Sequence, residues 1–483
     1  MFKFNHLNVI YPFWIIALCL FLQNCSRDQV SDEILTSFEL VLSIQGNGTV
    51  SPDSSLFVSN SPITITATPL NGYYFDRWEG LGELVEVSEY TFIITKNTQI
   101  KAIFLPIPTL QDEVELYSPK KIDENPVFMI ENGGTKAYLT DKTGLHLNTW
   151  NFEDKLGNDL ELLEDGSIVG LFKPESISFS FGGYGGILKK FDSSAALVWE
   201  YELNNEDYLL HHDFEILPSG NILLIVWEHF NEIEAQDLGF DGEGSIYLEK
   251  IIEWNPESRN IVWEWRSVDH LIQDFDPEAL NHGLIADHPE KIDLNYNDND
   301  KDNGDLMHAN GLFYDPIKDV IFLSVNFYSE VWVISHSNTT DESKTTSGDL
   351  KFRFGNSQAH QGIEDRMFYN NHHPSLVKLD PLTVDRFLIF INGSNENQSK
   401  VYEFELPVIF DENPLLWSTP EKTWSFTHPD LYYGKISGAY RLSNGNTLIC
   451  EGDYGYWEVT KNGEVVWKYN GDDKTFWRGY VYP

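Results

Sequence analysis

The chain has 483 residues, a length typical of roughly two to four domains. Its 33 Lys and Arg residues against 75 Asp and Glu residues give a formal net charge of −42. This charge argues against a protein that binds nucleic acid or an anionic membrane surface through basic patches. The 14 Trp, 23 Tyr and 31 Phe residues supply enough apolar surface for a folded core and exclude a disordered chain.

The N-terminal segment has the features of an export signal. An apolar run from Ile10 to Leu22 follows Lys3, and no acidic residue precedes Cys25. The run has the length of a signal-peptide core and is short for a membrane span. The sequence LQNCS at 22–26 resembles a bacterial lipoprotein processing site. We therefore predict that residues 1–24 are removed, that Cys25 is lipidated, and that the exported protein is anchored to the membrane, in the periplasm or at the cell surface. An ordinary cleaved signal peptide is the alternative.

Residues 25–37 are polar and predict a tether, and residues 38–105 predict a small β-rich module. Short alternating runs in the module are separated by Gly, Pro and Asn turns. Its segments GNGTVSP (46–52), GYYFDRWEG (72–80) and IKAIF (100–104) resemble the bacterial repeat of the internalin B type. The resemblance implies a β-grasp-like spacer or adhesion module. Trp78 is interpreted as a core anchor, because buried aromatic residues are common.

Residues 106–483 contain two recurring motif types. One is a turn followed by a buried strand, found in LEDGSIVGL (163–171), LPSGNILLI (217–225) and LSNGNTLIC (442–450). The other is an exposed aromatic strand, found in VWEYEL (198–203), VWEWRS (262–267) and VWKYN (466–470). Their spacing divides the stretch into about six four-stranded units, and radial repetition protects strand edges. We predict an all-β, six-bladed β-propeller; a β-sandwich would not explain two alternating motif types.

Three groups of histidines occupy corresponding places in these units. They are His211-His212, His308 and His372-His373, each just ahead of a repeated turn and strand. In a propeller, such places in different blades meet near the central channel on one face. Neighbouring strand residues point to opposite sides, so one member of each pair is expected to face the channel.

Clustered imidazoles serve two kinds of chemistry. Neutral His is a common metal ligand, but these groups contain no His-x-His or His-x-x-x-His pair, and Asp213 is the only obvious hard ligand nearby. Alternatively, one His attacks an anionic ester while another manages the proton of the leaving group. That chemistry needs no cofactor, and we predict neither a metal nor a cofactor. The acidic segment 293–305 does not fit the EF-hand spacing, so a solvated loop is favoured over a calcium site.

The predicted propeller is similar to the bacterial arylsulfotransferases along nearly all of its length. The resemblance rests on GGYGGILKKFDSSAALVWEYEL (182–203), HHDFEILPSGNILLI (211–225), EKIIEWNP (249–256), IVWEWRSVDHLIQDFD (261–276), MHANGLFYDP (307–316), IFLSVNFYSEVWVI (321–334), FRFGNSQAHQGIEDRMFYNNHHP (352–374), ISGAYRLSNGNTLICEG (436–452) and FWRGYVYP (476–483). It implies transfer of a sulfuryl group from a small phenolic sulfate to a phenol acceptor through a sulfated histidine. It also implies that no nucleotide sulfate donor is used.

The resemblance assigns roles to single residues. The family's Gln-His-Asp motif falls on residues 371–373, which makes His372 the sulfated histidine and puts His373 in place of the Asp. The His-Asp motif favours His212 over His211, and the His-x-Asn motif falls on His308. These three histidines, His372, His308 and His212, are the predicted catalytic residues.

One position departs from the family. The arginine expected near position 326 is Asn326 here. Sulfuryl transfer spreads charge over three oxygens, so the loss of a charged donor is expected to cost about 2–4 kcal/mol of transition-state stabilisation. Protonated His308 or His212, or the predicted substrate-binding residues Arg353 and Arg441 from neighbouring family motifs, are expected to compensate in part. A surface or blade-packing role is the alternative for the two arginines. The alternative function is a non-catalytic propeller that binds a ligand or a protein, and Asn326 and His373 are what favour it.

Overall fold

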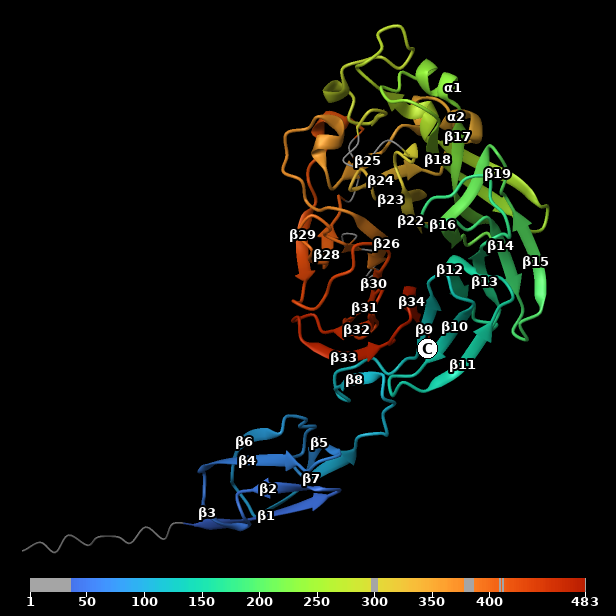
Figure 1. The fold of residues 1–483 in the computed structure, drawn as a ribbon. Coiled ribbons are helices and arrows are strands. Elements are labelled where there is room, and N and C mark those ends of the chain that lie inside the picture. Colours follow the sequence, from blue (N-terminus) through green and yellow to red (C-terminus); the bar gives the residue numbers. More distant parts are fainter. Residues whose placement is uncertain (1–35, 297–302, 378–385, 408–409, 411, 483) are drawn as a thin grey trace, which may run out of the picture. The chain divides into compact units, whose positions relative to one another are not determined.

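The structure is a computed structural model that describes residues 36–296, 303–377, 386–407, 410 and 412–482. The predicted signal peptide, Cys25 and nearly all of the predicted tether lie outside the described residues. The chain divides into two compact units, Met1–Ile107 and Pro108–Pro483. Both are built mainly from strands (Figure 1).

The N-terminal unit consists of two small sheets. One has the strand order β3-β1-β7-β5, with a parallel pair β1–β7, and the other has the order β2-β4-β6. The strands are β1 (Ser37–Gln45), β2 (Gly48–Ser51), β3 (Ser55–Val58), β4 (Pro62–Pro69), β5 (Tyr73–Glu79), β6 (Glu89–Ile93) and β7 (Thr98–Pro106). Trp78 is 1% exposed, and its ring centroid lies 5.4 Å from that of Phe75. The interpretation of Trp78 as a core anchor is confirmed.

The second unit contains a series of small antiparallel sheets in its described part. The first to third have the orders β11-β10-β9-β34, β12-β13-β14-β15 and β16-β17-β18-β19. Their strands are β9 (Val127–Glu131), β10 (Lys136–Thr140), β11 (His146–Asn151), β12 (Leu156–Leu162), β13 (Ile168–Phe172), β14 (Ile187–Phe191), β15 (Leu197–Glu202), β16 (Tyr208–Ile216), β17 (Ile222–Phe230), β18 (Ile246–Asn255), β19 (Asn260–Arg266) and β34 (Phe476–Val481).

The fourth to sixth sheets have the orders β22-β23-β24-β25, β26-β27-β28-β29 and β30-β31-β32-β33-β8. Their strands are β22 (Ala309–Asp315), β23 (Val320–Val325), β24 (Glu330–Ser335), β25 (Phe352–Phe354), β26 (Asn371–Val377), β27 (Arg386–Ile391), β28 (Lys400–Glu405), β29 (Glu421–Phe426), β30 (Gly438–Arg441), β31 (Thr447–Glu451), β32 (Gly455–Val459), β33 (Val465–Asn470) and β8 (Val114–Tyr117). A short parallel pair joins β20 (Leu271–Ile272) and β21 (Ile292–Asp293).

Each of the six sheets has one edge strand that packs against the neighbouring sheets. These inner strands contact one another in the order β12, β16, β22, β26, β30, β34 and back to β12. They lie towards the middle of the unit, with β11, β15, β19, β29 and β33 outside them (Figure 1). Strands from the two ends of the unit complete shared sheets, because β34 pairs with β9 and β8 pairs with β33. The all-β prediction is confirmed.

Both recurring motifs occupy the places that their patterns predict. Gly166, Gly220 and Gly445 have φ values of 79°, 83° and 87° in the turns that join β12–β13, β16–β17 and β30–β31. The strand after each turn is buried along most of its length, since neighbouring sheets cover both faces. The aromatic motifs form β15, β19 and β33, each of which is the fourth strand of its sheet. The expected exposure holds for β15 but is wrong for the aromatic residues of the other two strands, since Trp265 and Trp467 are 0% exposed.

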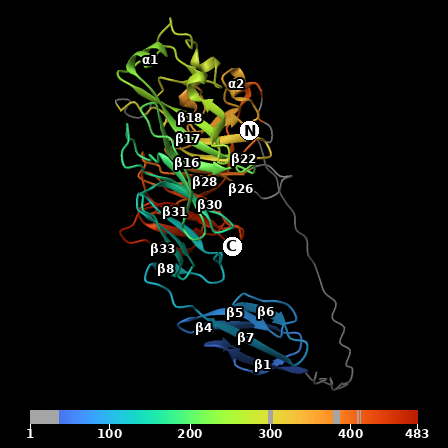
Figure 2. The same cartoon turned by 90° about the vertical axis from the view of Figure 1, so that its right-hand side faces the viewer.

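Helices are few and lie at the periphery. Helix α1 (Glu232–Asp237) contacts β17, and helix α2 (Thr340–Ser343) contacts β19 (Figure 2). Short 3-10 helices span Ser267–His270, Ile285–Asp287, Thr346–Gly348, Ser357–His360 and Pro414–Leu416. None of the helices formed by the described residues has the length and apolar character needed to cross a membrane.

Candidate functional site

Backbone irregularities place the histidines at the inner strands. The pairing of β16 with β17 shifts register between His211 and Phe214, and that of β26 with β27 shifts between His372 and Ser375. His212, His308 and His373 have φ values of 56°, 52° and 51°. Positive φ is uncommon for residues other than Gly and often marks a functional site. The same distortion therefore recurs in three different sheets, where it sets the direction of the histidine side chains.

His212 and His308 face each other across neighbouring sheets. Their ring centroids lie 4.7 Å apart, with the ring planes at 81°. The connection between β13 and β14 covers His212, whose backbone N–H donates to the carbonyl of Gly183 at 2.8 Å. A Cβ atom at Gly183 would lie 2.0 Å from Nε2 of His212, so only glycine fits there. Phe327 stacks on His308 at 4.5 Å and forms an aromatic wall beside it.

The tautomer of His372 follows from its partner. The Nδ2 group of Asn392 donates to the carbonyls of Tyr433 and Ile436, at 2.8 and 3.0 Å. The Oδ1 atom of Asn392 therefore faces His372, whose Nδ1 lies 2.5 Å away. Because an amide oxygen only accepts hydrogen bonds, Nδ1 of His372 carries the proton. Its Nε2 atom is then left with a lone pair, as a nucleophile requires.

His308 and His372 are driven towards opposite protonation states. Burial lowers the pKa of His372 to about 3, although its hydrogen bond to Asn392 opposes this shift. Burial also lowers the pKa of His308, but the carboxylate of Asp305 and, when it is ionised, that of Glu249 raise it, and the net shift is upward. The Nδ1 atom of His308 lies 2.5 Å from Oδ2 of Asp305. The site thus favours a neutral ring at His372 and a protonated ring at His308.

His212 is held from behind by a second histidine. Its Nδ1 lies 2.8 Å from Nδ1 of His211, and Nε2 of His211 lies 3.0 Å from Oε2 of Glu249. His211 also stacks on Trp227 at 3.8 Å, so His212 and not His211 is the member of the pair that faces His308. Burial lowers the pKa of both histidines.

The three predicted catalytic histidines share one arrangement. His212, His308 and His372 each use Nδ1 in a hydrogen bond. Within the part of the chain that the structure describes, Nε2 of each has no hydrogen-bond partner. Positive charge on His308 lowers the pKa of both other histidines, so the three rings influence one another electrostatically. The structure brings together the histidines that the sequence singled out.

An arginine that the sequence analysis did not single out lies among these residues. Arg478, on β34, is 2% exposed, and its Nη1 lies 3.1 Å from Asp159 and 2.9 Å from Asp213. Its Nη2 donates to the carbonyl of Asn310 at 2.9 Å. Its charge lowers the pKa of His372. The segment FWRG belongs to the resemblance, but it lacks the turn and following strand that mark the repeated units. Its strand, β34, pairs instead with β9, which is distant in sequence.

We expect Arg478→Met to destabilise the second unit strongly. The change leaves Asp159 and Asp213 buried without their cation, and breaking a buried ion pair costs about 3–5 kcal/mol. Urea denaturation of the full chain measures the loss in the free energy of unfolding. Lys121→Met is the matched control, because it breaks an exposed ion pair with Glu464 that is worth about 1 kcal/mol or less. Equal losses in the two variants would contradict the structural role of Arg478.

Asn326 lies beside His372, but its amide is already engaged. Its Nδ2 donates to the carbonyl of Asn371 at 3.1 Å, and its Oδ1 accepts from Asn370 at 3.2 Å. The Nδ2 atom also lies 3.5 Å from Nδ1 of His372. That contact is not a hydrogen bond, because Nδ1 is itself a donor to Asn392. Asn326 thus occupies the place expected for the family arginine without supplying its charge.

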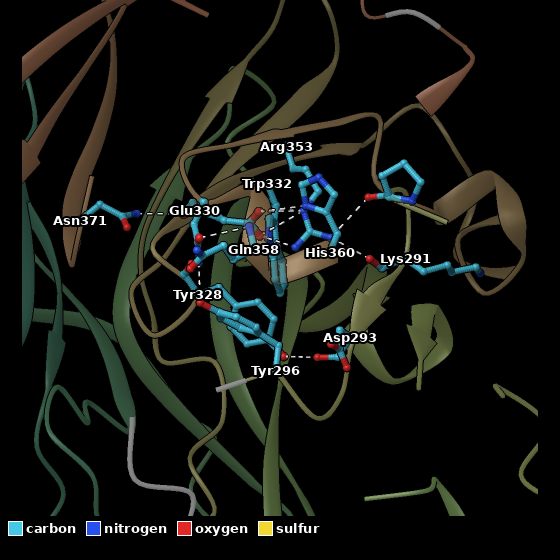
Figure 3. Close-up of polar contacts among 12 residues, drawn as sticks. Lys291, Asp293, Tyr296, Tyr328, Glu330, Trp332, Arg353, Gln358, His360 and Asn371 are labelled. Atoms are coloured by element: carbon cyan, nitrogen blue, oxygen red, sulfur yellow. Dashed lines mark hydrogen bonds and ion pairs between the residues drawn. The ribbon is translucent and has the colours of Figure 1, made fainter. Parts of the chain in front are cut away.

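Arg353 is not brought to the histidines. It lies on β25, the strand of its sheet furthest from β22, and its Nε donates to the two carboxylate oxygens of Glu330 at 3.0 and 3.1 Å. Its Nη1 donates to the carbonyl of Lys291 at 2.7 Å. Arg353, Glu330 and His360 lie close together (Figure 3). All three line a cavity of about 350 Å³. The predicted contact of Arg353 with substrate has no support in this geometry.

Arg441 and His373 line a different cavity, of about 760 Å³, which Asp213 and Arg478 also line. Arg441 pairs with Glu403 at 2.6 Å, and the Nδ1 of His373 accepts the backbone N–H of Ala439 at 3.2 Å. His212, His308 and His372 are not among the residues that line this cavity. Arg478 therefore contacts the cavity while its charge also acts on the histidines.

Potential metal ligands do not cluster in the part of the chain that the structure covers. No group of three or more His, Cys, Asp and Glu side chains there is arranged to hold a metal ion. Residues 297–302 of the acidic segment lie outside the described residues, whereas Asp305, from the same segment, pairs with His308.

Comparison with known proteins confirms the two resemblances. A family model described as arylsulfotransferase (ASST) matches residues 108–476, and one described as a divergent InlB B-repeat domain matches residues 39–108. No curated protein sequence matches the chain.

Solved structures with a similar arrangement include the periplasmic gluconolactonase of Pseudomonas aeruginosa, with 10% identity, a TM-score of 0.37, and coverage of 74% of this chain and 99% of that one. Apo AztD from Citrobacter koseri has 9% identity and a TM-score of 0.30, covering 74% of this chain and 97% of that one. The Dos1 propeller has 10% identity and a TM-score of 0.31, covering 72% of this chain and 68% of that one.

Proposed function

Because the chain belongs to the arylsulfotransferase family, we propose that it transfers a sulfuryl group from a phenolic sulfate ester to a phenol acceptor through a sulfated histidine, without a nucleotide sulfate donor. One observation carries the proposal. Three histidines on or next to the inner strands of three sheets each hold Nδ1 in a hydrogen bond and leave Nε2 without a partner among the described residues. The nitrogen atoms that can act on a substrate are therefore the three Nε2 atoms.

His372 is the nucleophile in this proposal. Its low pKa keeps the ring neutral, and the proton on Nδ1 leaves the lone pair on Nε2. The Nε2–S bond forms as the bond between sulfur and the phenolic oxygen breaks, and the first phenol leaves. The oxygen of the acceptor phenol then attacks sulfur, and the Nε2–S bond breaks. The two half-reactions form a ping-pong cycle.

The other histidines have different roles. His308, with its raised pKa and its Asp305 partner, supplies positive charge to the sulfuryl oxygens in place of the family arginine. His212 is neutral and manages the proton of the phenol. A phenolate leaving group benefits from an acid at neutral pH, because the pKa of a phenol is about 10.

The architecture that supports this site is a six-bladed β-propeller in our proposal. The contacts of the six inner strands in ring order and the two pairings between the ends of the unit support it. The N-terminal module, with its mixed sheet, is proposed as a β-grasp-like spacer, and Cys25 as a lipid anchor that holds the exported chain at the membrane.

A chromogenic assay tests the function directly. The purified protein is incubated with 4-nitrophenyl sulfate, with and without phenol. We expect one equivalent of 4-nitrophenol without the acceptor and continuous release with it, together with the formation of phenyl sulfate. Release that does not depend on the acceptor would indicate hydrolysis and would contradict the transfer.

We expect Asn326→Arg to raise the rate of sulfuryl transfer. The position lies beside His372, and a guanidinium there adds a second charged donor for the sulfuryl oxygens. An increase of about tenfold is expected, and turnover with 4-nitrophenyl sulfate and phenol measures it. Asn326→Gln is the control, since it lengthens the side chain without adding charge. An unchanged or lower rate in the Arg variant would show that the pocket is built around the Asn326 amide.

The non-catalytic alternative also rests on Asn326. The amide N–H of Asn326 donates to the carbonyl of Asn371 and is not free to donate to a substrate. The site therefore lacks the charged donor of the family arginine and gains no free neutral donor from Asn326. This alternative predicts that the wild-type protein binds an aryl sulfate in calorimetry but releases no phenol. Phenol release that requires His372 would exclude it.

A further inference from the structure

Three buried side chains form a continuous chain behind the site. Oε2 of Glu249 lies 3.0 Å from Nε2 of His211, and Nδ1 of His211 lies 2.8 Å from Nδ1 of His212. Glu249 and His211 are 0% exposed, and His212 is 3% exposed. Trp227 stacks on His211, and the backbone N–H of Ala309 donates to Oε1 of Glu249 at 2.7 Å. The chain begins at a carboxyl group and ends at the free Nε2 of His212.

When both histidines are neutral, the donors and acceptors of this chain can be arranged in two ways. When Glu249 is a neutral acid, its proton lies towards Nε2 of His211, Nδ1 of His211 donates to Nδ1 of His212, and Nε2 of His212 carries a proton. When Glu249 is ionised, His211 donates to the carboxylate, His212 donates to His211, and Nε2 of His212 has a lone pair. The state of a residue that does not reach the substrate thus decides whether His212 is an acid or a base.

We propose that Glu249 and His211 form a proton relay that lets His212 act as the acid in the first half-reaction and as the base in the second. This inference rests on the proposed sulfuryl transfer. In the first half-reaction, Nε2 of His212 gives its proton to the leaving phenolate, Nδ1 of His212 takes the proton of His211, and Nε2 of His211 takes the proton of Glu249. In the second, the acceptor phenol gives its proton to Nε2 of His212, and each proton returns one place. No proton is gained or lost over the cycle.

The charges around the chain favour the acid form at rest. Burial raises the pKa of Glu249 well above its ordinary value, and the nearby Asp305 adds to this shift, whereas Ala309 and His308 oppose it. Burial lowers the pKa of His211, with Asp305 and His308 acting in opposite directions. Burial lowers the pKa of His212, and the titratable or charged groups that lower it further are His308, His211, His372 and Arg478. The resting relay therefore holds one proton on Glu249, and both histidines are neutral.

Glu249→Gln tests the relay without changing its shape. The amide oxygen accepts from Ala309 and the amide N–H donates to His211, as the neutral acid does, but the amide has no proton to give up. We expect the burst rate with phenyl sulfate to fall by about 100-fold, because its phenolate needs a proton. With 4-nitrophenyl sulfate, whose leaving phenol is far more acidic, we expect a change of about threefold or less. His211→Phe keeps the stacking on Trp227 and is expected to show the same dependence on the leaving group.

Glu253→Gln is the matched control. Glu253 also lies on β18 and pairs with a histidine, because its Oε2 lies 3.0 Å from Nε2 of His336. This variant is expected to leave both burst rates unchanged. Equal losses with the two donors in Glu249→Gln would overturn the relay, since a distorted site would slow both alike. A wild-type protein that releases no phenol from either donor would overturn the relay together with the proposed function. An active enzyme whose Glu249→Gln variant loses the same rate with both donors would overturn the relay alone.

Discussion

His372→Ala is expected to abolish both the burst of phenol and steady-state turnover, a loss of about 10⁴-fold or more. The substitution removes the Nε2 lone pair that accepts the sulfuryl group, and neither His212 nor His308 replaces it. His212 is held as a proton carrier by His211, and His308 is an imidazolium beside Asp305, so it has no lone pair to offer. Stopped-flow measurement of phenol release measures the burst.

Mass spectrometry of the protein trapped without acceptor locates the modification. We expect the mass of a sulfuryl group on the peptide that contains His372. His270→Ala is the control, because it removes a buried histidine that pairs with Asp349 at 2.8 Å and has no contact with the three catalytic candidates. The control is expected to keep its burst. A sulfuryl group found on another residue would refute the assignment.

Asp305→Asn is expected to move the alkaline limb of the pH–rate profile to lower pH and to lower turnover at neutral pH by about 10–100-fold. Burial lowers the pKa of His308, and the Asp305 carboxylate raises it. Without this charge the pKa of His308 falls, and the imidazolium that faces the sulfuryl oxygens is lost at a lower pH. His308→Ala is expected to slow both half-reactions without moving the sulfuryl group from His372.

The sign of the effect on stability follows from the same shift. A group whose pKa is raised on folding stabilises the fold below its unfolded pKa, and this contribution is lost as the pH rises through the folded pKa. The wild-type protein should therefore lose the stability due to His308 as the pH rises above 6.5, whereas this loss should be smaller in Asp305→Asn. Asp319→Asn is the control, because it breaks a His–Asp pair with His336 outside the site. A pH–rate profile that responds equally to both substitutions would contradict the role of Asp305.

The repeated local patterns were enough to predict much of the fold. The turns at Gly166, Gly220 and Gly445 and the aromatic fourth strands depend on neighbours in sequence, and the structure has them at the expected places. The burial of β33, which β8 covers at its outer edge, was not expected. The all-β class and the family of the second unit are confirmed, as is the buried Trp78 of the first. These features depend on backbone dihedral angles and alternating burial, which a single stretch of chain encodes.

The sequence also indicated the three histidine groups, because their places relative to the repeated strands correspond, and the family resemblance selected His212, His308 and His372 within them. It did not indicate the partners that set their chemistry. Asp305 lies only three residues from His308 in sequence. In contrast, Asn392 comes after a different strand from the one that contains His372, and Glu249 is 38 residues from His211. Which nitrogen carries a proton depends on these partners, so it follows only from contacts between strands.

Arg478 and Arg353 also show that the sequence does not reveal which arginine lies near the histidines. Both are arginines in segments that resemble the family, yet Arg478 lies among the inner strands and Arg353 on an outer strand paired with Glu330. The sequence by itself determined the strands, the turns and the histidines, since each depends on local pattern and equivalent spacing. Only the tertiary structure decided which charges surround those histidines, because the charged residues come from separate sheets. Arg478 comes from β34, whose pairing partner β9 lies at the other end of the unit.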